Sequence, residues 1–290
     1  MRYDELKGLL ILTLITFVWG STFSFTKIAL EVFTPFFLLF LRFLLGAFAL
    51  FLFLILKRQR ISINFSGVIL GIINFSAIAF QTFGLRYTTA TKTAFITGLS
   101  VLLVPFFEKL VFKNKIYWNL WLAVFTGFIG LIFLTTDFSS ISTINWGDFL
   151  VLVCAVLYAI QIVYISYVVE RREIFDLAFS EILFTAIFSF LFFLIFEPRN
   201  LLLNFILKNS LSVIYLGIGA TAFTLTLQLV GQKYVSPTKS ALIYNLEPVF
   251  ATLFAFLLLS EKLNFQQIIG ASLILISLFI SIPSSFQNKS

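Results

Sequence analysis

Histidine is absent from the 290-residue chain, and cysteine occurs once, at Cys154. Without histidine the protein lacks the commonest metal ligand and the usual general base of a catalytic triad. A single cysteine forms no disulfide within one chain and no cysteine-based metal site. We therefore expect no metal site, no cofactor and no enzyme of the triad type.

Charged residues are also scarce. They make up 11% of the chain, whereas soluble domains average about 25%. Apolar residues account for 60%, and 40 residues are phenylalanine. Because such a chain has too few polar residues to cover a water-facing surface, it is interpreted as a membrane protein. The basic residues behind the net charge of +7 lie between apolar runs, which favours a membrane surface over nucleic acid as the partner.

The apolar runs have the length of membrane-spanning helices. A hydrocarbon core of about 30 Å requires about 20 residues at about 1.5 Å per residue. By that measure the sequence predicts an all-α integral membrane protein with ten transmembrane helices and no separate soluble domain. The predicted spans are 8–30, 36–56, 65–85, 92–112, 116–136, 147–168, 177–196, 211–231, 238–259 and 265–282.

The basic residues between spans predict the orientation. With the N-terminus placed in the cytoplasm, 13 Lys and Arg residues lie in cytoplasmic segments and 5 in outside segments. Cytoplasmic loops carry the excess of basic residues in membrane proteins. We therefore expect a multi-pass protein of the cell (cytoplasmic) membrane with both termini in the cytoplasm.

The chain contains an internal repeat. Phe80–Phe95 reads FQTFGLRYTTATKTAF, and 147 positions later Leu227–Leu242 reads LQLVGQKYVSPTKSAL. The first copy joins predicted spans 3 and 4, and the second joins spans 8 and 9. The chain is therefore predicted to consist of two five-helix repeats, residues 1–137 and 138–290. Because five is odd, the second repeat enters the membrane inverted, an organisation that places transporter substrate sites near the midplane between the halves.

Three motifs resemble the EamA branch of the drug/metabolite transporter superfamily. They are WGSTF at Trp19–Phe23, ITGL…VP at Ile96–Pro105, and LEPVFATLFAFLLLSEKL at Leu246–Leu263. The resemblance covers essentially the whole chain. It implies a ten-helix bundle of inverted repeats that moves small solutes by alternating access, with amino acids, nucleobases, other metabolites or drugs as substrates.

Two other classes remain as alternatives to such a carrier. A membrane-embedded enzyme needs clustered His, Asp or Cys at membrane depth, whereas the four Asp residues lie at span ends. A lipid-flipping or accessory membrane protein of the same fold is the second alternative. No GxxxxGK[ST] phosphate loop occurs in the sequence, so transport is expected to use solute exchange, a gradient or coupled protons. Spans 5 and 10 are predicted to be peripheral, in a monomer or a weak homodimer.

Ionisable side chains within spans cost about 2.5–3.5 kcal/mol each to insert and indicate function. Arg42 and Glu181 occupy matching places in the two halves and are interpreted as gate or substrate contacts, with snorkelling toward opposite surfaces as the alternative. Glu247 lies about 13 Å into its span, where a carboxylate requires a cationic partner or a bound proton. It is predicted to carry a coupling proton or to bind an ammonium group, with a structural role as the alternative.

Neutral polar and aromatic residues complete the predicted cavity. Gln81 and Gln228 recur at matching positions and are predicted to hydrogen-bond solute from both sides, or else to bond neighbouring helices. An aromatic and amide set suits a planar or amphipathic solute, although aromatic residues also form interfacial belts. This set is Trp19, Tyr158, Gln161, Tyr244 and Asn245, with Tyr164 on roughly the same helix face as Tyr158 and Gln161.

Other positions are assigned roles in shape rather than in binding. Pro105 and Pro248 each free a backbone carbonyl, which predicts either a gating hinge or an ordinary bend. The repeated glycines are interpreted as turn or close-packing positions, and the repeated lysines as interfacial anchors. These residues are Gly84, Gly231, Lys92 and Lys239.

Overall fold

The computed structural model describes residues 3–88, 90–113, 115–135, 145–198, 207–259 and 265–281. Regular secondary structure in these residues is helical, and they contain no strand. The predicted boundary between the repeats, 137/138, lies outside the described residues, so it stays a prediction.

The helices of the first repeat are α1 (Tyr3–Ala29), α2 (Pro35–Leu56), α3 (Phe65–Tyr87), α4 (Ala90–Gly98), α5 (Ser100–Phe112) and α6 (Trp118–Thr135). Those of the second are α7 (Trp146–Val168), α8 (Ile174–Phe196), α9 (Leu207–Ile214), the π-helix η1 (Tyr215–Phe223), α10 (Thr224–Gln232), α11 (Pro237–Tyr244), α12 (Leu246–Leu259) and α13 (Phe265–Ser281).

Local sequence signals account for several helix starts. The Asn64 side chain accepts a hydrogen bond from the Ser66 amide and caps α3. Asn145 and Asp148 form a reciprocal capping box at the start of α7. Proline, which lacks an amide hydrogen and has a helical φ, occupies the first turn of α2 and of α11.

Within the described residues, seven stretches of helix are long and apolar enough to cross a membrane. They are α1, α2, α3, Lys92–Phe112 in α4 and α5, α7, α8, and Leu211–Gln232 in α9, η1 and α10. Two further apolar helices, α6 and α13, are shorter. The remaining predicted span, 238–259, is interrupted at Asn245 between α11 and α12. The protein is therefore an all-helical membrane protein.

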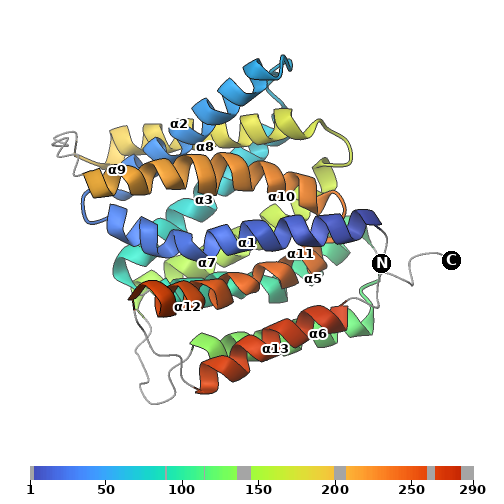
Figure 1. The fold of residues 1–290 in the computed structure, drawn as a ribbon. Helices are drawn as coiled ribbons and strands as arrows, with labels where there is room; N and C mark the ends of the chain where they lie inside the picture. Colours follow the sequence, from blue (N-terminus) through green and yellow to red (C-terminus); the bar gives the residue numbers. More distant parts are fainter. Residues whose placement is uncertain are drawn as a thin grey trace.

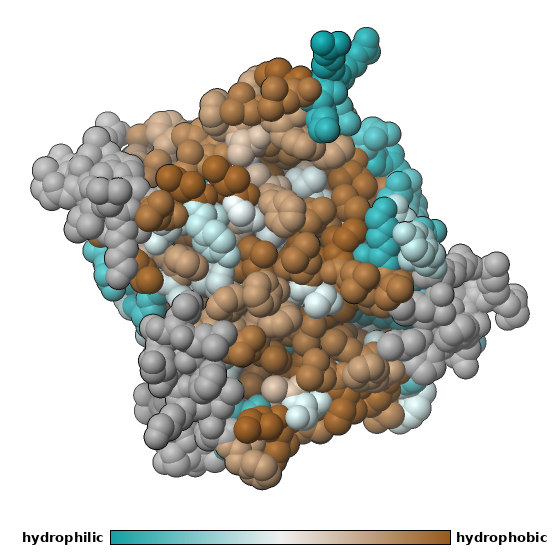
Figure 2. Space-filling view, viewed as in Figure 1, coloured by the Kyte–Doolittle hydropathy of each residue, from teal (hydrophilic) through white to brown (hydrophobic). Residues whose placement is uncertain are grey.

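The helices lie side by side across the molecule, with α1 in the middle and α6 beside α13 at one edge (Figure 1). An apolar band covers much of the face shown, with hydrophilic residues toward its two ends (Figure 2). We call the two ends of the bundle the Tyr3 end, where α1 and α11 begin and α5 ends, and the Thr88 end, where α3 ends and α4 and α7 begin.

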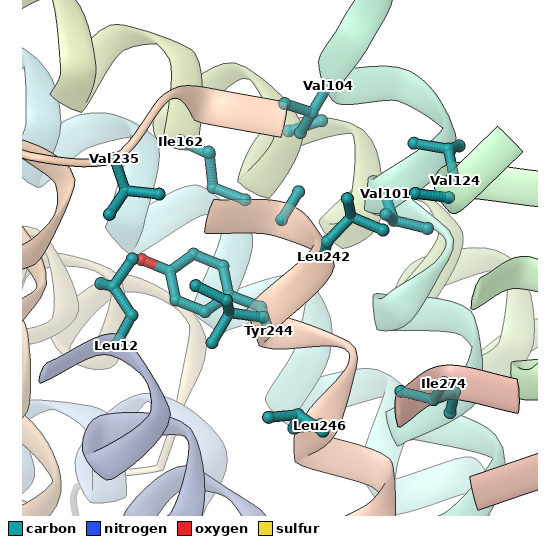
Figure 3. Close-up of a cluster of buried hydrophobic side chains, with 14 of the residues drawn as sticks. Leu12, Val101, Val104, Val124, Ile162, Val235, Leu242, Tyr244, Leu246 and Ile274 are labelled. Atoms are coloured by element: carbon teal, nitrogen blue, oxygen red, sulfur yellow. The ribbon is translucent and has the colours of Figure 1, made fainter. Parts of the chain in front are cut away.

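Two large apolar clusters fill the interior. One surrounds α11 and includes Leu12 of α1, Val104 of α5, Leu242 of α11 and Val235 of the connection before α11 (Figure 3). The other lies between α2, α3, α7, α8 and α10 and contains the fully buried Leu177. Packing between the repeats thus supplies much of the core.

Candidate functional site

A polar cavity opens between helices of both repeats. The space open to the centres of water-sized molecules is about 90 Å³. One water needs about 10–15 Å³ of such space, so the cavity has room for several waters or a small solute. Nine of the ten cavity residues predicted from the sequence line it: Trp19, Arg42, Gln81, Tyr158, Gln161, Gln228, Tyr244, Asn245 and Glu247. Glu181 does not line it.

Arg42 of α2 is held at the cavity wall by the π-helix η1. Its Nε donates to the Thr221 hydroxyl at 2.8 Å, and one terminal nitrogen donates to the Ala220 carbonyl oxygen at 3.1 Å. The Thr221 hydroxyl in turn donates to the Leu216 carbonyl oxygen five residues earlier. Because these bonds direct the side chain inward, Arg42 is buried and does not snorkel to a membrane surface.

Glu247 approaches the cavity from the interruption between α11 and α12. It lies in the first turn of α12, where the positive end of the helix dipole favours a negative charge. Arg42 lines the same cavity as this carboxylate. The cavity therefore carries a cationic group on α2 and an acidic group on α12, from different repeats.

Glu181 lies behind the cavity wall in a network of polar side chains. Its Oε1 accepts a hydrogen bond of 2.7 Å from Nε2 of Gln161, which itself lines the cavity. The same Gln161 nitrogen lies 3.4 Å from Oδ1 of Asn74, and the Asn74 amide donates to the Thr185 hydroxyl. Glu181 is fully buried, and its Oε2 has no hydrogen-bond partner among the described residues. Its observed contact is with the wall residue Gln161.

The aromatic residues form one side of the cavity. The ring centroids of Trp19 and Tyr244 are 5.5 Å apart, and the Trp19 indole nitrogen donates to the Thr224 hydroxyl at 3.0 Å. Tyr158 of α7 is half-buried and also lines the cavity. An indole and two phenol rings thus give the cavity flat apolar surfaces beside its charged groups.

The repeated glutamines both line the cavity. Gln81 donates to the Thr97 hydroxyl at 3.1 Å, and Gln228 shares the cavity lining with Tyr244. Thr97 and Tyr244 are themselves 147 positions apart, as the glutamines are. The polar lining therefore follows the internal repeat.

The two helix interruptions also occur at cavity depth. The helix breaks at Leu99, between α4 and α5, and at Asn245, between α11 and α12. Pro248 lies in the first turn of α12, directly after the second break, and lines the cavity. Pro105 lies inside α5, six residues after the first break, and does not line it. A hinge role for either proline stays a prediction.

The repeated lysines form ion pairs, unlike the interfacial anchors that the sequence suggested. Nζ of Lys92 lies 3.5 Å from Oδ2 of Asp148 at the Thr88 end. Nζ of Lys239 lies 2.7 Å from Oε1 of Glu5 at the Tyr3 end. Both pairs join helices of different repeats.

The repeated glycines allow close packing, as expected. A Cβ on Gly84 would lie 2.9 Å from the Gly147 carbonyl oxygen of α7. A Cβ on Gly231 would lie 2.8 Å from Cγ of Leu12 in α1. Each glycine therefore brings its helix against the first helix of the other repeat.

The sequence interpretation missed polar residues that position the cavity groups. Thr221 and Thr224 bind Arg42 and Trp19, and Asn74 lines the cavity beside Gln161. Thr221, Thr224 and Gln228 recur at spacings of three and four residues, which places them on one helix face. That spacing was an available signal, whereas the π-helix has no comparable signature.

Comparison with known proteins identifies the family. The model of the EamA-like transporter family matches the chain twice, over residues 6–136 and 145–282. An uncharacterized transporter of Archaeoglobus fulgidus is 35% identical over 274 residues, which cover 93% of this chain and 83% of the relative. The uncharacterized transporter YoaV of Bacillus subtilis is 23% identical over 278 residues, covering 92% and 94% of the two chains.

A protein of known crystal structure shares the fold. Its TM-score is 0.81 at 18% identity, and the superposition covers 95% of this chain and 98% of that one. The resemblance noted in the sequence motifs is confirmed by the two family matches, and the relatives' names indicate a transporter rather than an enzyme. The chain belongs to the EamA-like transporter family of multi-pass membrane proteins.

Proposed function

We propose that this protein is a secondary transporter that moves small metabolites across the cytoplasmic membrane by alternating access. In this proposal the chain crosses the bilayer ten times as two inverted five-helix repeats, with both termini in the cytoplasm. The observation that carries it is the cavity between the repeats, which has Arg42 and Glu247 facing one space. Ionisable groups at membrane depth are costly, and in transporters they mark solute or ion pathways.

The cavity lining favours a class of substrate. A cationic and an acidic group together match a solute that bears both an anionic and a cationic or hydrogen-bonding group. The flat surfaces of Trp19, Tyr158 and Tyr244 match a planar or apolar portion. The amides of Gln81, Gln228 and Asn245 add neutral hydrogen-bonding groups. Amino acids with an apolar or aromatic side chain meet all of these requirements, and nucleobases meet the planar and hydrogen-bonding ones.

The helix interruptions support alternating access. Discontinuous membrane helices form midplane binding sites in many inverted-repeat transporters, because the free backbone ends face the solute. Here the breaks at Leu99 and Asn245 lie next to cavity residues of α4 and α11. Rocking of one repeat against the other around these breaks opens the cavity to each side in turn.

Glu247 is the proposed coupling residue. It shares the cavity with Arg42, so a bound cationic solute or a proton competes for the same carboxylate. Coupling then follows when solute release and proton binding occur on opposite sides of the membrane. Gln161 separates Glu181 from the cavity, so Glu181 is less suited than Glu247 to carry the coupling proton.

The test is uptake by purified protein in liposomes. Radiolabelled amino acids and nucleobases are screened with and without a pH gradient, and Glu247→Gln is compared with the wild type. We expect saturable uptake by the wild type that depends on the pH gradient. The variant is expected to lose uptake or its pH dependence, because glutamine keeps the size of the side chain but binds no proton.

Two outcomes would contradict the proposal. Equal uptake and equal pH dependence in both proteins would make Glu247 structural. Movement of fluorescent lipid head groups without uptake of any water-soluble solute would favour the lipid-flipping alternative. Glu170→Gln is the matched control, since Glu170 is exposed after the end of α7 and lies outside the cavity.

A further inference from the structure

The two copies of the internal repeat make equivalent contacts with the opposite halves of the molecule. In the first copy Gly84 packs on α7, and Lys92 pairs with Asp148 in the first turn of α7. In the second copy Gly231 packs on α1, and Lys239 pairs with Glu5 in the first turn of α1. Each copy therefore binds the start of the first helix of the other repeat, at opposite ends of the bundle.

Both ion pairs lie between the cavity and an end of the bundle. Lys92 precedes the cavity residue Thr97 by five residues, and Lys239 precedes the cavity residue Tyr244 by five residues. Five residues of helix correspond to about 7.5 Å. Each lysine thus lies within one and a half turns of the cavity along the chain, and Lys92 is two residues from the cavity residue Ala94.

The pair at the Tyr3 end is the tighter of the two. The distance from the lysine nitrogen to the carboxylate oxygen is 2.7 Å in the Lys239 pair and 3.5 Å in the Lys92 pair. The Lys239 side chain is 9% exposed, whereas the Lys92 side chain is 26% exposed. At the same end Glu108 accepts hydrogen bonds from the amide and hydroxyl of Thr238. The apolar cluster of Figure 3 includes Leu12 of α1 and Leu242 of α11, the two helices that this pair joins, and the cavity residue Tyr244.

We propose that the two ion pairs are the latches of the transporter: Lys239–Glu5 closes the cavity at the Tyr3 end, and Lys92–Asp148 closes it at the Thr88 end. The inference deepens the proposed alternating access and rests on it. Opening the cavity to the Tyr3 end separates α11 from α1, and opening it to the Thr88 end separates α4 from α7. The repeat motif is therefore present twice because the bundle needs one latch at each end.

The test measures access to the cavity from each side, which requires no known substrate. A single cysteine is placed in the cavity as Ser100→Cys, in a background where the buried Cys154 is changed to alanine. A membrane-impermeant maleimide is applied to right-side-out and inside-out vesicles. Lys57→Cys, exposed after the end of α2, marks the side on which the Tyr3 end lies.

Breaking one latch is expected to increase labelling from one side. Lys239→Gln and, separately, Glu5→Gln should raise labelling of the cavity cysteine from the Tyr3 end by about twofold to fivefold. This is the increase in the population open at that end that follows when an ion pair of modest strength is lost. Lys92→Gln should raise labelling from the Thr88 end. The exchanged pair Glu5→Lys with Lys239→Glu should restore the original labelling.

The same labelling assay provides the matched controls and shows which results would contradict the proposal. Lys233→Gln and Arg86→Gln remove exposed cations at the Tyr3 and Thr88 ends respectively and should leave labelling unchanged. Labelling that stays constant in latch variants with wild-type unfolding temperatures would overturn the proposal. An equal rise from both sides would overturn it as well, since that result indicates general loosening. Failure of uptake alone would count against the proposed function and not against the latches.

Discussion

Individual polar residues hold the charged groups of the cavity in place. Arg42 donates to the Thr221 hydroxyl and to the Ala220 carbonyl oxygen, so two bonds orient one guanidinium. A buried donor that loses its acceptor costs about 1–3 kcal/mol, because no water replaces the lost bond. The π-helix therefore positions a charged group of the cavity, although it contributes no charge itself.

Thr221→Val tests this arrangement. Valine keeps the shape of threonine but removes the acceptor for Arg42, so we expect the free energy of unfolding to fall by about 1–3 kcal/mol. Thr226→Val is the matched control, because its hydroxyl donates to the Ala222 carbonyl oxygen of its own helix, as that of Thr221 does to Leu216. Thermal unfolding in detergent measures both. Equal losses would show that the Arg42 bond contributes no stability.

At the scale of the helix, small residues decide which elements approach closely. Gly84 brings α3 against α7, and Gly231 brings α10 against α1. In a bilayer, close backbone approach is a main source of helix association, because lipid and side chains are equally apolar. The glycines thus position the two helices that also carry the acidic partners of the lysines.

Gly84→Ala is expected to destabilise the protein by about 1–3 kcal/mol through overpacking. Its new methyl group would meet the Gly147 backbone, which cannot move aside as the tip of a side chain does. Gly219→Ala is the control, since a Cβ there lies 3.4 Å from the Tyr215 ring, in ordinary contact. Unfolding temperatures in detergent should fall for the first variant only. A similar fall in both would show that the loss does not come from the close contact of α3 with Gly147, since replacing a helical glycine by alanine is otherwise stabilising.

At the scale of the whole molecule, the duplication relates the two ends of the bundle. The lysines and glycines of the two motif copies lie 147 positions apart and contact equivalent partners in opposite repeats. Inversion follows when the first repeat crosses the membrane an odd number of times. The proposed topology therefore places Lys57 and Lys233 on the cytoplasmic side and Arg86 outside.

Cysteine labelling tests that topology directly. In the Cys154→Ala background, an impermeant maleimide applied to intact cells should label Arg86→Cys but neither Lys57→Cys nor Lys233→Cys. All three positions are exposed, so access to the reagent depends on the side of the membrane. Permeabilised cells provide the control in which all three react. The reverse pattern would overturn the proposed orientation. Labelling of all three positions in intact cells would contradict the proposed membrane crossings of the chain between these positions.

Composition and pattern alone determined the class of this protein. The scarcity of charge, the apolar runs and the repeat predicted an all-helical membrane protein of duplicated design, because span length and hydropathy are properties of short segments. The family motifs predicted a transporter, which the family matches support. Nine predicted residues line one cavity, and their contact with solute stays a prediction.

Tertiary structure decided the contacts made between the repeats. The π-helix that binds Arg42, the separation of Glu181 from the cavity by Gln161, and the two lysine ion pairs depend on which helices become neighbours. The sequence placed Lys92 and Lys239 at helix starts. At such a position a lysine that anchors at the interface and one that forms an ion pair have the same sequence pattern. Their acidic partners lie 56 and 234 positions away, so packing of one repeat against the other brings them within reach.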